Sequence, residues 1–321
     1  MIAPTIPIGR NQYTALVAAN IPICREHYRL VLSLSQFPPS RPGQFIQIAC
    51  QDSVFESSPA ELEWEPCSWP RPTGRELREP VTFLRRPFSL AGRRDLPRGV
   101  ELDIIHREIG LGSRWLAKLK CGDTVNILGP LGNAFELPPP SDTALLVGGG
   151  VGIPPMIYLA SQLADRPAVA FAGAVCKDLL SLTITGDPIP GSALPSHVAA
   201  EFTAFGIPTV LATDDGSCGV GGYVTAALEG YLKFHAPANV TIFTCGPEPM
   251  MKRVADIALG RNIPCQVAVE RAMACGMGTC QSCCIRVRKT DPAQPPLPGN
   301  DWCYRLACTD GPIFTAAQLL W

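Results

Sequence analysis

Four cysteines fall within ten positions near the end of the chain, in the stretch "MACGMGTCQSCCIRVR". Cys275, Cys280 and Cys283 follow the spacing C-x4-C-x2-C, and further thiols lie downstream. Plant-type [2Fe-2S] clusters use this arrangement, in which three thiolates come from one loop and the fourth from a distant segment. Gly276 and Gly278 allow the backbone of the loop to wrap closely around inorganic sulfides. The spacing therefore predicts a [2Fe-2S] cluster.

A structural zinc site is the alternative for these cysteines. Zinc sites favour paired C-x2-C knuckles, and the four-residue gap between Cys275 and Cys280 fits that pattern poorly. Spacing alone leaves the fourth thiolate open, because Cys284 adjoins the triplet and both Cys303 and Cys308 lie downstream.

A glycine-rich loop, "ALLVGGGVGIPPM", separates an apolar strand from a helix that opens with proline. Its glycines are Gly148, Gly149, Gly150 and Gly152. Glycines let backbone amides approach a pyrophosphate, and the N-terminus of a helix offers unpaired N–H groups to it. Ile153 stands where the usual dinucleotide fingerprint has its third glycine, so a tight turn without a ligand is the alternative. The strand and helix alternation around the loop favours a nucleotide site.

The motif "RRPFSL" carries a third candidate site. Arg86 can neutralise a phosphate, and Ser89 can form a hydrogen bond with a flavin ring or ribityl oxygen. The later "GLGS", which opens a helix, is a second place for an anion to bind. A solvated surface charge is the alternative for Arg86, and its neighbours favour the phosphate.

Three regions of different pattern must position these motifs. Residues 1–140 contain short β-rich runs separated by turns, which is typical of an antiparallel β-barrel, and 51–80 reads as an inserted loop. Residues 141–263 alternate strands with amphipathic helices, as in an α/β doubly wound sheet. Residues 264–321 are irregular and rich in Cys and Pro. The sequence therefore predicts a multi-domain protein with barrel, nucleotide and cluster domains.

Composition narrows the class of protein. The 321 residues are 46% hydrophobic, which is ample for several packed cores. A net charge of -1 gives no electrostatic support for binding nucleic acid or an anionic membrane surface. The sequence shows neither a long apolar span nor the pattern of a signal peptide, so we expect a cytoplasmic protein whose thiols stay reduced.

Seven motifs follow one another along the chain: "RRPFSL", "GPLGNAF", "GGGVGIPPM", "TDDGSCGVGGYV", "CGPEPMMKRVA", "ERAMACGMGTCQSC" and "CTDGPIF". Their order resembles that in the electron-transfer subunits of the two-subunit, NAD-dependent dihydroorotate dehydrogenases, a family within the ferredoxin-reductase superfamily. The likeness extends over nearly the whole chain. It implies that one polypeptide binds FAD, a [2Fe-2S] cluster and NAD.

The resemblance also implies roles for individual residues. Beside FAD it places Arg86, Pro87, Phe88 and Ser89, then Ile105, His106 and Arg107 on the next strand, with Gly112 and Ser113 at the pyrophosphate. Around the nicotinamide nucleotide it places Gly148, Gly149, Gly150 and Gly152, together with Cys245, Gly246, Pro247 and Glu248. For the cluster it adds Cys308, within "CTDGPIF", to Cys275, Cys280 and Cys283, and it leaves Cys284 and Cys303 as spectators.

The function implied by this resemblance is electron transfer in pyrimidine biosynthesis. Electrons would pass from an FMN-containing catalytic subunit through the cluster and FAD to NAD+, in a heterotetramer. A flavin must lie between the other two groups, because nicotinamide exchanges two electrons as hydride and the cluster one at a time. The sequence shows no catalytic triad or carboxylate pair. A flavin-bearing (β/α)8 barrel of about 250 residues does not fit beside the three domains, so dihydroorotate oxidation requires the partner.

Other functions remain as alternatives. A reductase subunit for an oxygenase, a hydrogenase or a ferredoxin would contain the same three cofactor sites. A zinc-binding interaction module is the alternative from a different class. For the nucleotide, Asp178 follows the second strand of the α/β region as an acceptor for a ribose hydroxyl, and no arginine follows it there. We therefore expect NAD rather than NADP, although Lys177 lies beside Asp178.

Overall fold

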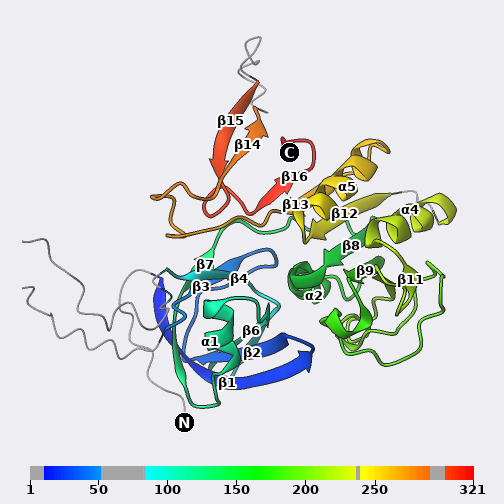
Figure 1. Ribbon diagram of the computed structural model, residues 1–321. Coiled ribbons are helices and arrows are strands. Elements are labelled where there is room, and N and C mark those ends of the chain that lie inside the picture. Colours follow the sequence, from blue (N-terminus) through cyan, green and yellow to red (C-terminus); the bar gives the residue numbers. More distant parts are fainter. Residues whose placement is uncertain (1–10, 52–81, 83, 236–238, 290–300) are drawn as a thin grey trace, which may run out of the picture.

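The computed structural model describes residues 11–51, 82, 84–235, 239–289 and 301–321. Two large sheets lie side by side, and a small hairpin from the C-terminal region lies beyond them (Figure 1). The predicted insertion at 51–80 falls almost wholly outside the described residues, and so does the proline-rich stretch 290–300.

The first sheet contains β1 (Gln12–Cys24), β2 (His27–Leu34), β3 (Phe45–Ile48), β4 (Arg86–Ser89), β5 (Gly92–Leu96), β6 (Gly99–Arg107) and β7 (Thr124–Leu131). All its pairings are antiparallel, in the order β4-β3-β7-β1-β2-β6-β5. Because side chains alternate along a strand, one face buries a core that includes Leu30, Ile46 and Leu102. Strands β4 and β5 end the order, and among the described residues they do not pair, so closure into a barrel is not shown. The short helix α1 (Leu111–Ala117) connects β6 to β7.

The second sheet contains β8 (Thr143–Gly149), β9 (Ala168–Ala174), β10 (Thr209–Thr213), β11 (Val220–Gly221), β12 (Val240–Cys245), β13 (Cys265–Ala268) and β16 (Ile313–Thr315). The order is β11-β10-β9-β8-β12-β13-β16, and every pairing except that of β16 is parallel. This agrees with the predicted doubly wound sheet. The order reverses beside β8, which is where such sheets leave a crevice for ligands.

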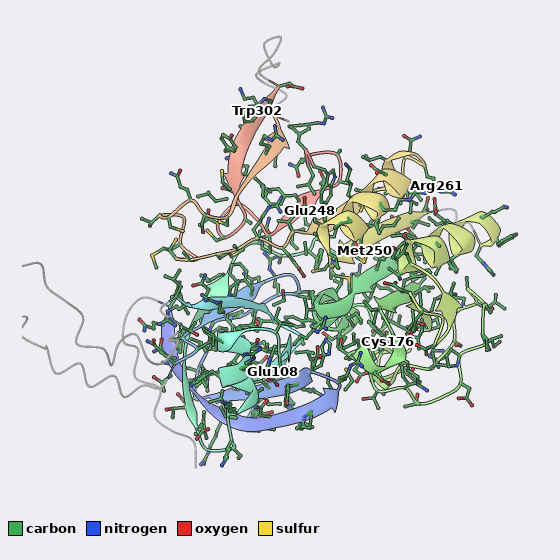
Figure 2. All side chains as sticks on the ribbon, in the orientation of Figure 1. Glu108, Cys176, Glu248, Met250, Arg261 and Trp302 are labelled. Atoms are coloured by element: carbon green, nitrogen blue, oxygen red, sulfur yellow. The ribbon has the colours of Figure 1, made fainter. Side chains whose placement is uncertain are left out.

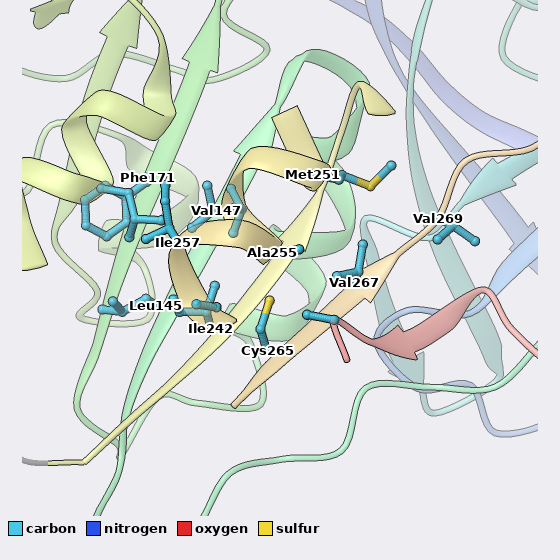
Figure 3. Close-up of a cluster of buried hydrophobic side chains, with 14 of the residues drawn as sticks. Leu145, Val147, Phe171, Ile242, Met251, Ala255, Ile257, Cys265, Val267 and Val269 are labelled. Atoms are coloured by element: carbon cyan, nitrogen blue, oxygen red, sulfur yellow. The ribbon is translucent and has the colours of Figure 1, made fainter. Parts of the chain in front are cut away.

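Helices cover both faces of the second sheet: α2 (Ile153–Ala160), α3 (Ala200–Thr203), α4 (Val224–Phe234) and α5 (Glu248–Leu259), with the single turns η1 (Gly150–Gly152) and η2 (Lys177–Leu179). Alternate residues of β8 pack on opposite faces. Leu145 and Val147 join a core with α4 and α5, and Leu146 joins a core with α2 and α3. Figure 3 shows the first of these cores.

The C-terminal region, predicted as a cluster domain from residue 264 onward, contributes strands both to the second sheet and to a separate hairpin. Strands β13 and β16 are hydrogen-bonded into the second sheet. Outside it lie the cysteine loop and the hairpin of β14 (Cys284–Arg288) and β15 (Trp302–Leu306). The sequence alone does not reveal the pairing partners of the two short β-runs at 265–268 and 313–315, and the boundary at 263/264 stays a prediction.

Direct contacts join the two large sheets. The hydroxyl of Tyr158 on α2 donates to the carbonyl of Ser40 at 2.7 Å. The backbone N–H of Arg25 donates to the carbonyl of Asp178 at 3.0 Å. These bonds hold the end of β1 and the loop before β3 against the α/β region, so that a shared cleft forms between them.

Candidate functional site

A cleft of about 1370 Å³ lies between the two sheets. Strands β4 and β6 and the start of α1 form one wall, and the carboxyl ends of β8, β9 and β12 form the other. Residues 268–273, from the last residue of β13 towards the cysteine loop, also line it. One continuous cleft therefore joins the flavin motif to the nucleotide crevice.

Most of the residues predicted for FAD and the nicotinamide nucleotide line this cleft. They are Arg86, Pro87, Phe88, Ser89, Ile105, His106, Arg107, Gly112, Ser113, Gly149, Gly150, Cys245 and Pro247. Four predicted residues do not line it: Gly148, Gly152, Gly246 and Glu248.

The four residues outside the lining have packing roles that explain their positions. A Cβ on Gly152 would overlap the carbonyl of Cys245, and one on Gly148 would come within 2.9 Å of Ile153 Cα. Gly246 has φ +149° and lies against Gly149. Glu248, at the start of α5 (Figure 2), forms an ion pair with Arg271 and so ties α5 to the segment after β13.

The two adjacent arginines of "RRPFSL" have different surroundings. Arg85 is half-buried and donates to Asn126, and burial lowers its pKa. Arg86 is exposed, donates only to the carbonyls of Leu84 and Arg85, and forms no ion pair within the described part of the chain. Arg86 is thus the arginine whose charge remains available to a phosphate in the cleft.

Gly112 and Ser113 lie where α1 begins. A Cβ on Gly112 would meet the side chains of Arg86 and Cys50 at 3.3 Å, so glycine allows the helix to approach β4. The Ser113 hydroxyl accepts N–H bonds from Ile109 and Gly110 at 2.9 and 3.0 Å. It therefore acts as a cap that fixes the first turn of the helix against the cleft.

Two buried histidines face the cleft from paired strands. His106 is 2% exposed and stacks on Tyr28, with ring centroids 5.6 Å apart. Burial, assisted by nearby His27, lowers the pKa of His106 to about 4, so the ring is neutral at pH 7. Neither of its ring nitrogens, nor Nε2 of His27, has a hydrogen-bond partner among the described residues. Unpaired buried nitrogens of this kind fit a bound polar ring system such as a flavin.

The sequence reasoning missed His27, because only strand pairing brings it to the cleft. It lies opposite Arg107 in the antiparallel register of β2 and β6. The β-rich run that forms β2 was visible in the sequence, but its partner was not.

A second aspartate lies at the nucleotide crevice. Asp178, the predicted acceptor for a ribose hydroxyl, lies in η2 and is not among the residues that line the cleft, whereas Asp214, which follows β10, is. Burial and the neighbouring Asp215 raise the pKa of Asp214. Asp214 is therefore a further candidate to meet a ribose, and the role of Asp178 stays a prediction.

Cys245 and Glu270 come together at the end of β12. Burial and the charge of Glu270 raise the pKa of the Cys245 thiol, which therefore stays protonated. Glu270 keeps solvent contact through the cleft, yet the surrounding protein removes enough water to raise its own pKa. Tyr223 and Arg253 also line the cleft and were not predicted.

The four cysteines predicted as cluster ligands form two neighbouring pairs. Cys275 and Cys280 are in hydrogen-bond contact with each other, and so are Cys283 and Cys308. Sγ of Cys275 also accepts N–H bonds from Met277 and Cys280, both at 3.4 Å. The charge of Cys275 contributes to raising the pKa of Cys308, so the two pairs are close to one another. Two pairs of thiols suit two irons, each of which takes two thiolates.

The members of these pairs differ in their surroundings. Hydrogen bonds, first from Ser282 and then from Cys275, lower the pKa of the exposed Cys280 to about 6. Burial raises the pKa of Cys308 to about 11, and Cys283 is equally buried at 2% exposed. Within the residues that the structure describes, no three His, Cys, Asp or Glu side chains converge on a position for one metal ion.

Cys284 and Cys303 lie on the hairpin beyond the loop. Cys284 begins β14 opposite Leu306, and Cys303 on β15 lies opposite Val287. Cys303 packs against the core that α4 and α5 cover. Their role as spectators stays a prediction.

Comparisons with known proteins agree with this geometry. A family model described as the iron-sulfur cluster binding domain of dihydroorotate dehydrogenase B matches residues 270–320. The electron transfer subunit of dihydroorotate dehydrogenase B (NAD(+)) from Bacillus caldolyticus is 34% identical over 319 residues, covering 98% of this chain and 99% of its own. Its counterpart from Streptococcus mutans is 34% identical over 243 residues, covering 74% and 81%.

Solved structures share the fold. The NADH-dependent reduced ferredoxin-NADP oxidoreductase superposes with a TM-score of 0.67 at 24% identity, covering 96% of this chain and 90% of its own. The ferredoxin reductase in carbazole 1,9a-dioxygenase gives 0.56 at 20% identity, covering 81% and 68%. No helix in the described residues is both long and apolar enough to cross a membrane. The resemblance seen in the motifs is confirmed, and the chain belongs to the family of electron transfer subunits of dihydroorotate dehydrogenase B.

Proposed function

We propose that this chain carries electrons from an FMN-containing dihydroorotate dehydrogenase subunit, through a [2Fe-2S] cluster and FAD, to NAD+ in pyrimidine biosynthesis. One observation carries the proposal. Phe45 lines the cleft and also packs in the same core as Cys283 and Cys308. The core that contains Cys283 and Cys308 thus reaches the wall of the cleft at Phe45, as an electron path between a flavin and a cluster requires.

FAD would be held by the wall of the cleft that β4, β6 and α1 form. The free guanidinium of Arg86 binds the pyrophosphate beside the first turn of α1, and Ser89 orients the flavin. The neutral rings of His106 and His27 would supply hydrogen-bonding groups to it. When bound, the flavin supplies the exchange between a two-electron hydride and single electrons.

The nicotinamide nucleotide would occupy the opposite wall. The backbone N–H groups of Gly149 and Gly150 would bind its pyrophosphate, and Asp214 would accept a hydrogen bond from a hydroxyl of its ribose. A carboxylate at that position repels a 2'-phosphate, which supports NAD over NADP. Cys245 and Glu270 lie at the carboxyl end of β12, where they position the nicotinamide ring and exclude water from it.

The cluster would be held by Cys275 and Cys280 on one side and by Cys283 and Cys308 on the other. The exposed side of this loop, with Met277 61% exposed and Tyr304 of β15 63% exposed, provides the face on which a catalytic subunit docks. We propose a heterotetramer of two such pairs. We also propose that the first sheet curves into a barrel, since β4 and β6 are in contact although they do not pair.

Co-purification with the candidate FMN subunit tests the function. The pair is expected to contain FAD, FMN, iron and acid-labile sulfide and to reduce NAD+ with dihydroorotate, and the isolated chain is expected not to do so. Turnover by the isolated chain would contradict the two-subunit proposal. A pair that reduces a ferredoxin or an oxygenase with NADH, but not NAD+ with dihydroorotate, would favour a different reductase partner.

A further inference from the structure

Gln47 is a fully buried polar side chain in the middle of β3. It is 0% exposed, and neither Oε1 nor Nε2 of its carboxamide has a hydrogen-bond partner among the described residues. An unpaired buried polar group costs about 1–3 kcal/mol, so side chains of this kind normally have a partner. The carboxamide is therefore positioned for a group other than the neighbouring side chains.

The carboxamide lies against the cysteine loop. A Cβ placed on Gly276 would come within 2.8 Å of both Cδ and Nε2 of Gln47. Gly276 directly follows Cys275, and its φ of +71° places it in the left-handed region where glycine is favoured. Any larger residue at 276 would push the loop away from Gln47. Glycine at position 276 thus allows a close approach between this amide and the loop that carries Cys275.

Gln47 lies under the cysteine loop and is not among the residues that line the cleft. Pro87, its partner in the register of β3 and β4, and Phe45, two residues earlier, share its face of the sheet, and both line the cleft. Phe45 also belongs to the buried core that includes Cys283 and Cys308. The contents of the cysteine loop, against which the carboxamide lies, are thus a better partner for it than a ligand of the cleft.

We propose that Gln47 is a positioning residue that tunes the cluster, with Nε2 donating a hydrogen bond to a sulfur acceptor in the loop of Cys275. This inference rests on the proposed function, because it requires a cluster at the four cysteines. Hydrogen bonds to the sulfurs raise the reduction potential of a cluster, since a donor stabilises the negative charge added on reduction. Gln47 therefore makes the cluster easier to reduce.

Two substitutions separate the donor from the volume of the side chain. Gln47→Met keeps a similar volume and removes the N–H donor, and Gln47→His keeps one N–H donor. The midpoint potential of the cluster is measured on the purified, loaded full-length chain by a redox titration followed by electron paramagnetic resonance. Gln47→Met is expected to disfavour reduction about tenfold, which is 59 mV for a one-electron couple. Gln47→His is expected to stay within about threefold of the original protein.

Gln44→Met is the matched control. The carboxamide of Gln44 accepts a bond from the backbone N–H of Arg41 at 2.9 Å and donates to the carbonyl of Gly132 at 2.8 Å. Its removal is expected to lower the melting temperature and to leave the potential unchanged, because both of its partners are backbone groups outside the cysteine loop. A shift that appears equally in Gln44→Met would show that general loosening, not the donor, sets the potential.

The outcomes distinguish this inference from the function on which it rests. An original protein that binds no iron or sulfide overturns the proposed function itself. A full cluster with an unchanged potential in Gln47→Met overturns the role of Gln47 alone. If Gln47→Met does not fold, Gln47→Asn, which withdraws the amide by one methylene, must shift the potential in the same downward direction, and an unchanged value there also overturns the role.

Discussion

The side chain of Arg86 lies over Gly112, where α1 begins. A Cβ added to Gly112 would come within 3.3 Å of Arg86 Cγ. Arg86, whose guanidinium forms no ion pair among the described residues, and the first turn of the helix therefore line the cleft side by side. A strand and a helix that are separated by more than twenty residues thus form one anion-binding corner.

Arg86→Ala is expected to weaken FAD binding about tenfold to a hundredfold, because a hydrogen bond to a charged group contributes about 1.5–3 kcal/mol. Fluorescence titration of the deflavinated chain with FAD measures the change. Arg85→Ala is the neighbouring control. Arg85 donates to Asn126 within the first sheet, so its loss is expected to lower the melting temperature and to leave FAD affinity nearly unchanged. Equal losses of affinity in both variants would contradict the assignment of separate roles.

Asp214→Ser is expected to raise kcat/KM for NADPH about tenfold or more relative to NADH, because the substitution removes a carboxylate that would repel a 2'-phosphate. Dye reduction by each nucleotide measures the ratio. Asp178→Ser is the control, since Asp178 does not line the cleft. A change of preference in Asp178→Ser alone would restore the interpretation made from the sequence.

The two aspartates show where sequence reasoning reaches its limit. The alternation of strands and helices was sufficient to predict a doubly wound sheet with its glycine loop at the crevice, and Gly149 and Gly150 do line the cleft. Which acid faces the crevice depends on how far each strand extends and on the turn that comes after it. Asp178 falls in a short turn held to Arg25, and local composition carries no sign of that contact.

Partners that come from another part of the chain were equally invisible. His27 reaches the cleft only through its register with Arg107, and Gln47 meets Gly276 across more than two hundred residues. The spacing of Cys275, Cys280 and Cys283 could be read directly, since one loop positions all three. Residues that a single local element positions were therefore predictable, and those that depend on pairing between distant elements were not.

Gly152→Ala is expected to destabilise the α/β region by about 1–3 kcal/mol, because a Cβ there would overlap the backbone carbonyl of Cys245 and force β12 away from η1. Thermal unfolding measures the change. Gly110→Ala is the control: an added Cβ at Gly110 meets nothing within 4 Å. Its φ of -146° suits any residue, so its melting temperature should stay close to the original. A larger loss in Gly110→Ala would argue against close packing as the reason for Gly152.

Folding stability is expected to fall as the pH drops from about 6.5 towards 4. His106 has a pKa of about 4 in the folded chain and an ordinary one when unfolded, so between these values the unfolded chain binds the extra proton. The full loss of stability is about 3 kcal/mol. Above pH 6.5 this contribution is fully present and no longer changes with pH. Urea unfolding at pH 7 and pH 5 is expected to show a smaller difference in His106→Gln than in the original chain. The exposed His197→Gln is the matched substitution, and a reduced pH dependence there instead would contradict the assignment to His106.

Cys308→Ser is expected to abolish the [2Fe-2S] cluster, whereas Cys303→Ser and Cys284→Ser are expected to keep it. Cys308 is 2% exposed and contacts Cys283, and the backbone N–H of Gly278 points to its sulfur. Cys303 instead occupies a strand position opposite Val287, where a serine hydroxyl replaces the thiol without removing a ligand. Iron and acid-labile sulfide per chain, together with the visible spectrum, measure the outcome.

Retention of two irons in Cys308→Ser, or their loss in Cys303→Ser, would move the fourth ligand to the hairpin. If the original chain contains zinc and no iron or sulfide, the cysteines form a structural zinc site instead of a cluster.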